Sequence, residues 1–111
     1  MQSFTLSRIP EIIFGAGKIS ELAPKAAALA GQGARVLVVA DPALGPLGIT
    51  SRTLQILAGA GLEATVYDGL RGEPKAADID TASAMARATR AKAIIGVGGG
   101  SALDTAKLVA C

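Results

Sequence analysis

Short apolar runs alternate with amphipathic segments along this chain. Residues 35–40 (Arg-Val-Leu-Val-Val-Ala), 62–68 and 93–97 (Ala-Ile-Ile-Gly-Val) have the length and the aliphatic content of β-strands. The first and the last of these runs are almost wholly apolar, which is typical of strands that are buried on both faces of a parallel sheet. The run at 62–68 alternates less regularly, and we predict it to be a strand as well.

The segments between these runs repeat their apolar residues with the period of an α-helix. Pro24 would kink the first of these helices unless it lies in the first turn. Either Asp78 or Asp80 is expected to cap the third. The predicted helices cover residues 18–30, 48–60, 77–90 and 101–110.

Strands that alternate with helices predict parallel pairing through right-handed crossovers. Residues 3–6 and 11–14 predict two further strands, separated by Pro10, at or near the sheet edge. We therefore expect an α/β fold: a Rossmann-like three-layer domain with a mostly parallel sheet and extra N-terminal strands at the edge. Because domains commonly have about 100–150 residues, residues 1–111 are expected to form one domain.

The composition narrows the possible chemistry. The chain contains no His, and its one cysteine is Cys111, so neither a disulfide within the chain nor a Cys/His zinc site is expected. The 11 basic and 9 acidic residues are scattered among few aromatic residues, which argues against a nucleic-acid partner. No apolar run approaches the roughly 18 residues of a membrane helix, and residues 1–8 lack the pattern of a secretion signal. We expect a soluble, cytoplasmic protein without a membrane partner.

Three consecutive glycines and a serine separate the predicted strand 93–97 from the last predicted helix. They are Gly98, Gly99, Gly100 and Ser101. Glycines let a ligand approach the backbone closely, and the free N–H groups of a helix N-terminus favour an anion. The pattern predicts a phosphate or pyrophosphate site, and its alternative is a glycine-rich turn without a ligand.

The dinucleotide fingerprint Gly-x-Gly-x-x-Gly/Ala fits this loop only loosely, and the Walker pattern does not fit it. The acidic residue that accompanies this fingerprint and binds the ribose has a candidate earlier in the chain. Asp41 directly follows the strand at 35–40. At the carboxyl edge of the sheet its carboxylate could accept both ribose hydroxyls and would repel a 2′-phosphate, which favours NAD over NADP. Alternatively, Asp41 caps a turn beside Pro42.

Three further charged residues are candidates for the same crevice. Asp104 and Lys107 share a face of the last predicted helix. Asp104 is expected in its first turn, near the phosphate, and the alternative is a surface ion pair of little energetic value. Glu73 lies in the loop after the strand at 62–68, and its alternative is a solvated loop carboxylate.

Residues 98–107 (Gly-Gly-Gly-Ser-Ala-Leu-Asp-Thr-Ala-Lys) resemble the Gly-Gly-Gly-Ser-x-x-Asp-x-x-Lys motif of the iron-containing (group III) alcohol dehydrogenases. Residues 10–17, 36–42 and 94–97 follow the family's order and rough spacing, so the resemblance spans almost the whole chain. It implies an NAD(P)-dependent oxidoreductase that interconverts alcohols with aldehydes or ketones. In that family the first half binds the nucleotide, while a second, helical half binds iron or zinc through Asp and His.

By position, the resemblance also implies that Asp41 binds the adenosine ribose and that the pyrophosphate is bound by Gly99, Gly100 and Ser101. It places Asp104 near the nicotinamide side and Glu73 in a loop that contacts the cofactor. The chain departs from the family where the loop often has Asn-Pro-Thr or Asp-Pro-Thr, because here it has Glu-Pro-Lys at residues 73–75. The family's metal ligands have no counterpart. The resemblance thus implies that residues 1–111 are the NAD-binding half of a longer, homo-oligomeric enzyme, and that this half is inactive by itself.

Two alternatives remain open at this point. One is a related polyol dehydrogenase or dehydroquinate synthase-like enzyme on the same scaffold, and the other is a stand-alone nucleotide-binding module without catalysis. A truncated chain would expose apolar residues of its last helix, and a stand-alone module would not. The residues concerned are Leu103, Ala106, Leu108 and Val109.

Overall fold

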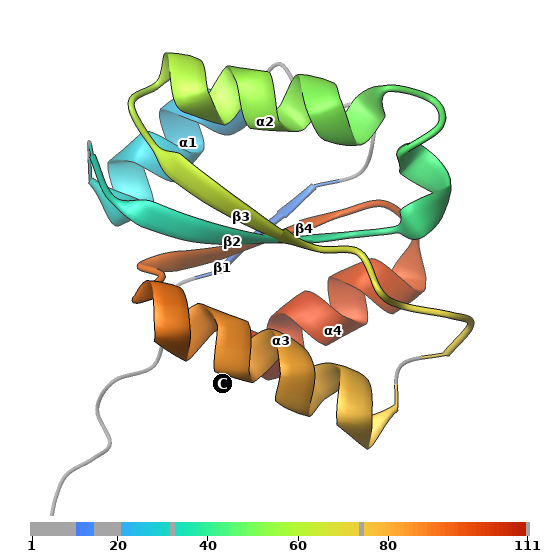
Figure 1. The fold of residues 1–111 in the computed structure, drawn as a ribbon. Coiled ribbons are helices and arrows are strands. Elements are labelled where there is room, and N and C mark those ends of the chain that lie inside the picture. The colour runs from blue at the N-terminus through green and yellow to red at the C-terminus, as the bar shows by residue number, and fades with distance from the viewer. Residues whose placement is uncertain (1–10, 15–20, 32, 74, 111) are drawn as a thin grey trace, which may run out of the picture.

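The computed structural model describes residues 11–14, 21–31, 33–73 and 75–110. Every strand and helix predicted within these ranges is present (Figure 1). The strands at 11–14, 35–40 and 93–97 have the predicted ends, while the strand predicted at 62–68 and the helices differ at one or both ends. The strand predicted at residues 3–6 lies outside the described residues. The elements are β1 (Glu11–Phe14), α1 (Leu22–Ala30), β2 (Arg35–Ala40), the short 3-10 helix η3 (Pro42–Leu44), α2 (Ile49–Gly59), β3 (Glu63–Tyr67), α3 (Ala76–Thr89), β4 (Ala93–Val97) and α4 (Gly100–Ala110).

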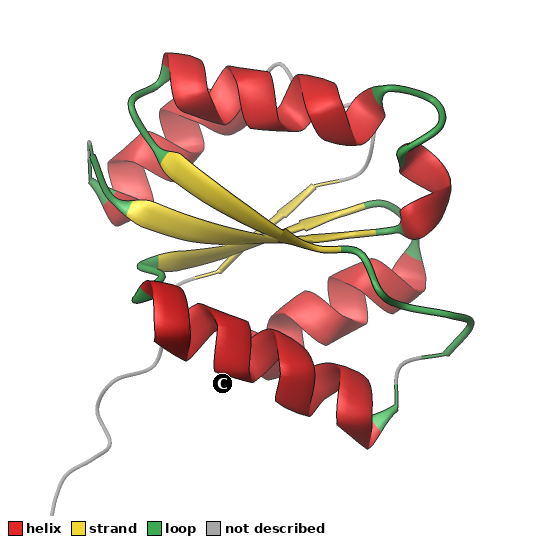
Figure 2. Ribbon diagram, in the orientation of Figure 1, coloured by secondary structure: helices red, strands yellow, loops and turns green. Residues whose placement is uncertain are grey.

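The strands form one four-stranded sheet in the order β1-β4-β2-β3. All three neighbouring pairs are parallel. Helices α1 and α2 cover one face of the sheet, and α3 and α4 cover the other (Figures 1 and 2). The predicted three-layer α/β, Rossmann-like fold is confirmed, and residues 11–14 form an edge strand as expected.

The two central strands are buried because helices cover both of their faces. From Val36 to Ala40, every side chain of β2 is fully inaccessible to solvent. Alternate residues of β2 point to opposite faces, so Val36 and Val38 pack in one core cluster while Leu37 and Val39 pack in the other. This burial on two sides explains why the strand is a continuous apolar run.

Helix α4 turns its apolar residues inward. Ala106 and Val109 are buried, Leu103 is half-buried, and only Leu108 is exposed, at 55%. The expectation of an exposed apolar face around these residues is therefore wrong for Ala106 and Val109. The helical period places both on the side that faces the sheet, and Leu108 points away from it.

The residues at which α1 and α3 begin decide two points that the sequence left open. Helix α1 begins at Leu22, so Pro24 lies in its first turn, where a missing backbone N–H breaks no helical hydrogen bond. Helix α3 is capped by Asp78 rather than Asp80: the backbone N–H of Lys75, the residue before the helix, donates to Asp78 Oδ2 at 2.9 Å.

Among the described residues, none of the helices has the length and apolar character needed to cross a membrane.

Candidate functional site

The carboxyl ends of β2 and β4 lie side by side at one edge of the sheet. Ala40 pairs with Val97 as the last pair of the ladder, and the backbone N–H of Asp41 donates to the Val97 carbonyl oxygen at 3.0 Å. Since both strands leave the sheet here, Asp41 and the glycine loop, 57 residues apart by their numbers, become neighbours. Parallel pairing thus brings together the two strongest candidates from the sequence.

Gly98 is in direct contact with Asp41. A Cβ atom added to Gly98 would lie 2.5 Å from the Asp41 Cβ atom, and Gly98 has a φ of +130°. Both the close approach and the backbone conformation require glycine. The loop can therefore pass against Asp41 only because residue 98 has no side chain.

Helix α4 offers free backbone donors at this edge. It begins at Gly100, one residue earlier than predicted, and the Leu103 N–H donates to the Gly99 carbonyl oxygen at 3.2 Å. The N–H groups of Gly100, Ser101 and Ala102 precede this bond, so they have no acceptor within the helix. Together with the helix dipole they favour an anion.

A second glycine fixes how close α4 comes to the sheet. A Cβ atom on Gly96, within β4, would lie 3.0 Å from the Ala106 Cβ atom and 3.2 Å from Leu103 Cδ2. Any larger residue at this position would push α4 outward. The small residues in β4 and α4 therefore determine where the helix N-terminus meets the edge of the sheet.

Asp41 uses its two carboxylate oxygens differently. Oδ1 accepts a hydrogen bond from the Ala43 N–H at 2.9 Å and so caps η3. This is the capping role that the sequence left open. Oδ2 makes no hydrogen bond within the described residues, and it lies 3.8 Å from where a Cβ atom of Gly99 would be. One oxygen thus holds the turn, while the other remains available beside the glycine loop.

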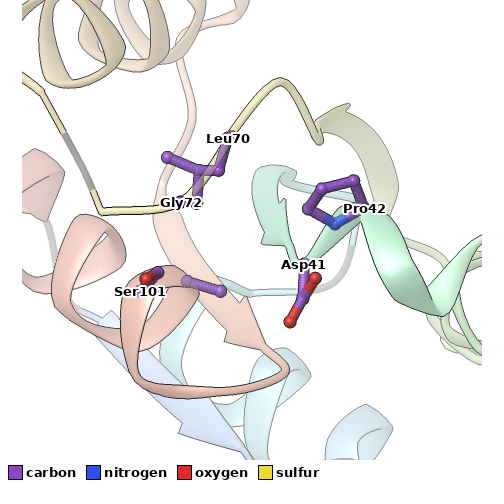
Figure 3. A pocket seen from close by; sticks show the side chains of 6 residues that line it. Asp41, Pro42, Leu70, Gly72 and Ser101 are labelled. Carbon is purple, nitrogen blue, oxygen red and sulfur yellow. The ribbon is translucent and has the colours of Figure 1, made fainter.

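A cavity of about 180 Å³ lies between Asp41 and the start of α4 (Figure 3). Its opposite wall comes from the β3–α3 loop, for which residues 68–73 and 75 are described. Leu70 of this loop is 2% exposed. The lining residues are Asp41, Pro42, Leu70, Gly72, Ser101 and Ala102. Of these, Leu70, Gly72, Pro42 and Ala102 were missed, although a loop that follows a parallel strand at its carboxyl end was a signal for them.

The other predicted charged residues do not line this cavity. Glu73 is exposed beside Gly72, and Asp104 and Lys107 are exposed on α4. Asp104 is the fifth residue of α4, so its predicted place in the first turn is wrong because the helix starts earlier. The described part of the chain shows no ion pair between Asp104 and Lys107. Their roles toward a cofactor, like that of Glu73, stay predictions.

A tyrosine and an aspartate join the two ends of the β3–α3 loop. The Tyr67 hydroxyl donates to Asp78 Oδ1 at 2.7 Å, and the Lys75 N–H donates to Asp78 Oδ2. Burial and the adjacent Asp78 carboxylate raise the pKa of Tyr67. The Lys75 N–H and the Tyr67 hydroxyl lower the pKa of Asp78, since both donate to the charged carboxylate.

A second hollow, of about 320 Å³, lies at the amino edge of the sheet. Arg35 is 3.7 Å from Glu63 across neighbouring strands. Arg90 caps the C-terminus of α3, where the helix carbonyls carry partial negative charge and favour cations. A structural role therefore accounts for Arg35 and Arg90. The lining residues are Gly33, Ala34, Arg35, Glu63, Arg90 and Lys92.

The two groups implied by the resemblance fit this chain differently. The free N–H groups of α4, the contact at Gly98 and the open Asp41 oxygen suit the phosphates and ribose of a dinucleotide. A divalent metal does not fit. The sequence has no His, and the described residues contain no group of three or more His, Cys, Asp or Glu side chains that could hold a metal ion.

Comparison with known sequences agrees with this arrangement. The model of the family described as "Iron-containing alcohol dehydrogenase" matches residues 10–111. Sulfoacetaldehyde reductase from Bilophila wadsworthia is 34% identical over 105 residues, which are 95% of this chain and 27% of that protein. Long-chain-alcohol dehydrogenase 1 from Geobacillus thermodenitrificans is 36% identical over 96 residues, which are 86% of this chain and 24% of that protein.

Comparison with solved structures gives the same picture. An iron-containing alcohol dehydrogenase from Thermococcus thioreducens matches with a TM-score of 0.72 and 26% identity, over 92% of this chain and 26% of that one. NADH-dependent butanol dehydrogenase A from Thermotoga maritima matches with a TM-score of 0.73 and 25% identity, over 98% of this chain and 27% of that one. The chain spans about a quarter of the length of the relatives it matches.

Proposed function

Because the chain belongs to the iron-containing alcohol dehydrogenase family, we propose that it forms the cofactor-binding part of an enzyme that transfers hydride between an alcohol and NAD. The observation that carries this proposal is the contact between Gly98 and Asp41 at the carboxyl edge of the sheet. It places a free carboxylate oxygen and the N-terminus of α4 on the same cavity, which suits one ligand that has both hydroxyl and phosphate groups.

Each part of the cavity has a separate task in this proposal. The N–H groups of Gly100 and Ser101 donate to the pyrophosphate, since they have no acceptor within α4. Asp41 Oδ2 accepts hydrogen bonds from the adenosine ribose hydroxyls and repels a 2′-phosphate, so NAD binds better than NADP. Bound NAD supplies the carbon that accepts or gives up the hydride. Leu70 excludes water from the opposite wall.

We assign cofactor binding to this chain, and its described residues offer no metal site. The iron or zinc expected for an enzyme of this family would need ligands from outside these residues. The proposed substrates are alcohols or aldehydes, in line with the names of the relatives. Homo-oligomerisation and a cytoplasmic location, like the contacts of Asp104 and Glu73 with the cofactor, are further parts of the proposal.

A second candidate is a nucleotide-binding module that folds and acts by itself. The burial of Ala106 and Val109 favours it, since α4 packs into the core of this chain. A polyol dehydrogenase or a dehydroquinate synthase-like enzyme on the same scaffold would use the same cofactor cavity. These enzymes would differ in substrate rather than in the residues discussed here.

Calorimetric titration of the 111-residue chain with NAD and NADP tests the proposal directly. We expect NAD to bind, NADP to bind at least about tenfold more weakly because of Asp41, and no alcohol oxidation by this chain alone. Failure of NAD to bind to the folded chain would refute cofactor binding. Equal affinities for NAD and NADP would refute the role given to Asp41 while leaving the phosphate site standing.

A further inference from the structure

The wall of the cavity opposite Asp41 belongs to a loop with no secondary structure of its own. Leu70 and Gly72 line the cavity from this loop. Within the part of the chain that the structure describes, the Arg71 side chain bonds only to carbonyl oxygens of the same loop, those of Leu70 at 2.8 Å and Asp68 at 3.4 Å. These bonds shape the loop but do not attach it to the sheet or to the helices. The attachments come from the buried Leu70 side chain, which belongs to the same core cluster as Tyr67 and Ala102, and from Tyr67 itself.

Tyr67, the last residue of β3, supports the loop with its ring. A Cβ atom on Gly69 would lie 3.1 Å from the Tyr67 hydroxyl oxygen and 3.2 Å from ring carbons. The backbone of the loop thus lies directly against the tyrosine ring, and a side chain at residue 69 would separate them. The Tyr67 side chain itself is 9% exposed, so its ring is a fixed part of the core.

The hydroxyl of the same tyrosine reaches across the loop to α3. It donates to Asp78 Oδ1 at 2.7 Å, while Asp78 Oδ2 accepts from the Lys75 N–H at 2.9 Å. A single carboxylate therefore joins the end of β3 to the residue that precedes α3. Hydrogen bonds to a charged acceptor are stronger than those between neutral groups. The two ends of the loop are held at a fixed separation.

We propose that Tyr67 and Asp78 are positioning residues for cofactor binding, which hold the β3–α3 loop so that Leu70 and Gly72 form the second wall of the cavity. This inference rests on the proposed function, because it concerns the affinity of the same cavity. Neither residue lines the cavity. Their effect on a dinucleotide is therefore indirect, through the loop.

The composition provides a specific spectroscopic test. Tyr67 is the only tyrosine and the chain has no tryptophan, so tyrosinate absorbance in the 111-residue chain reports this contact alone. The charged groups that act on Tyr67 are Asp78, Arg71 and Asp68, and Asp78 is in turn paired with the Lys75 N–H. We expect wild-type Tyr67 to titrate above the ordinary value of about 10 and D78N to titrate closer to it. Identical titration curves for the wild type and D78N would overturn the contact between Tyr67 and Asp78.

Ligand affinity separates positioning from simple stabilisation. Y67F removes only the hydroxyl and keeps the ring that supports Gly69. We expect Y67F and D78N to bind ADP-ribose roughly threefold to tenfold more weakly than the wild type, as the loss of one hydrogen bond implies. The matched control is T81A, which removes a hydroxyl on the same helix that donates to the Ala77 carbonyl oxygen and should leave the affinity unchanged.

Proteolysis measures the loop itself. Trypsin should cleave after Arg71 faster in Y67F than in the wild type or T81A, since the loop opens more often when its anchor is lost. A wild-type chain that binds ADP-ribose and a folded Y67F that binds it equally well would overturn the positioning role alone. A folded wild-type chain that binds no ADP-ribose would overturn the proposed function, and the positioning role with it.

Discussion

The two edges of the sheet differ in the backbone groups that they offer to a ligand, and the charges at these edges do not show this difference. The amino edge carries Arg35, Arg90 and Lys92 around a hollow of about 320 Å³. The smaller cavity at the carboxyl edge has Asp41 as the only charged residue among its described lining residues. Charge alone would therefore place an anion at the amino edge. The backbone instead favours the carboxyl edge, because the free N–H groups of α4 lie there. The amino edge has the C-terminal end of α3, whose carbonyl groups do not attract an anion.

This comparison shows which edge of the sheet offers unused, oriented backbone donors to an anion. At the amino edge the Glu63 N–H donates to the Ala34 carbonyl oxygen, and the Lys92 N–H donates to that of Arg35. These backbone donors are used, and the cations there are long, exposed side chains that lose entropy when they are ordered. At the carboxyl edge the donors are already oriented and unused. Preorganised backbone groups, more than net charge, predict the ligand site.

The largest expected effect comes from Gly98→Ala. The new Cβ atom would lie 2.5 Å from the Asp41 Cβ atom, in a backbone conformation with φ of +130°. Such strain costs about 3 kcal/mol, which corresponds to roughly a hundredfold loss of NAD affinity if it is relieved by moving the loop. Calorimetric titration measures this loss.

The matched control for Gly98→Ala is Gly33→Ala at the amino edge. Gly33 also has a positive φ, of +82°, but a Cβ atom there meets nothing within 4 Å. This substitution should lower the free energy of unfolding by about 1–2 kcal/mol and leave NAD affinity unchanged. Equal losses of affinity in the two variants would remove the distinction between the two edges.

Asp41→Ala should weaken NAD binding by about tenfold or more, because hydrogen bonds to a charged group contribute about 1.5–3 kcal/mol. Asp41→Asn separates the two tasks of this residue. It keeps an oxygen that can accept from the Ala43 N–H but removes the negative charge, so NADP should bind nearly as well as NAD. Glu63→Ala at the amino edge serves as the control, with both affinities expected to match the wild type.

A smaller effect is expected at the amino edge from Arg90→Gly. Among the described residues, Arg90 is the only non-glycine residue with a positive φ, of 55°. Glycine there should raise the free energy of unfolding by up to about 1 kcal/mol, measured by chemical denaturation. Arg90→Ala removes the same charge but keeps the strain, and it should not stabilise the chain. A change in NAD affinity in either variant would contradict the view that this edge is structural.

The smallest effect concerns pH. The pKa of Asp78 is lowered in the folded state, chiefly by the Lys75 N–H and then by the Tyr67 hydroxyl. Its stabilising contribution is therefore complete above the unfolded pKa of about 4 and is lost as pH falls through the lower, folded pKa. The melting temperature of Asp78→Asn should lie below that of the wild type near neutral pH, and the gap should narrow below pH ~4. The control is Asp80→Asn, at an exposed residue of the same helix, and its melting temperature near neutral pH should match that of the wild type.

Local pattern determined the elements of the fold. The apolar run of β2 and the glycines after β4 identify a buried strand and a helix start without any knowledge of the neighbouring segments. Periodicity was less reliable for single residues. It did not reveal that α4 starts at Gly100, which moves Asp104 out of the first turn, because a loop glycine and a helical glycine look the same in sequence.

The candidate site was half predictable. Asp41 and the glycine loop were found because each follows a strand at its carboxyl end, and a parallel sheet collects these ends at one edge. Leu70 and Gly72 were missed because the position of their loop after a strand indicates the edge of the sheet but not which residues of the loop face the cavity. Its position depends on the contact of Tyr67 with Asp78, eleven residues apart, which neither periodicity nor a motif indicates.

The sequence by itself thus determined the order and type of the elements, the aliphatic core and the family, since these depend on local hydrophobic period and on a contiguous motif. Only the tertiary structure decided that Gly98 lies against Asp41, that the open Asp41 oxygen Oδ2 lies beside Gly99, and that Leu70 lines the cavity. The physical reason is that these contacts join segments far apart in the chain. Their distances are set by strand register and helix packing, which no local pattern encodes.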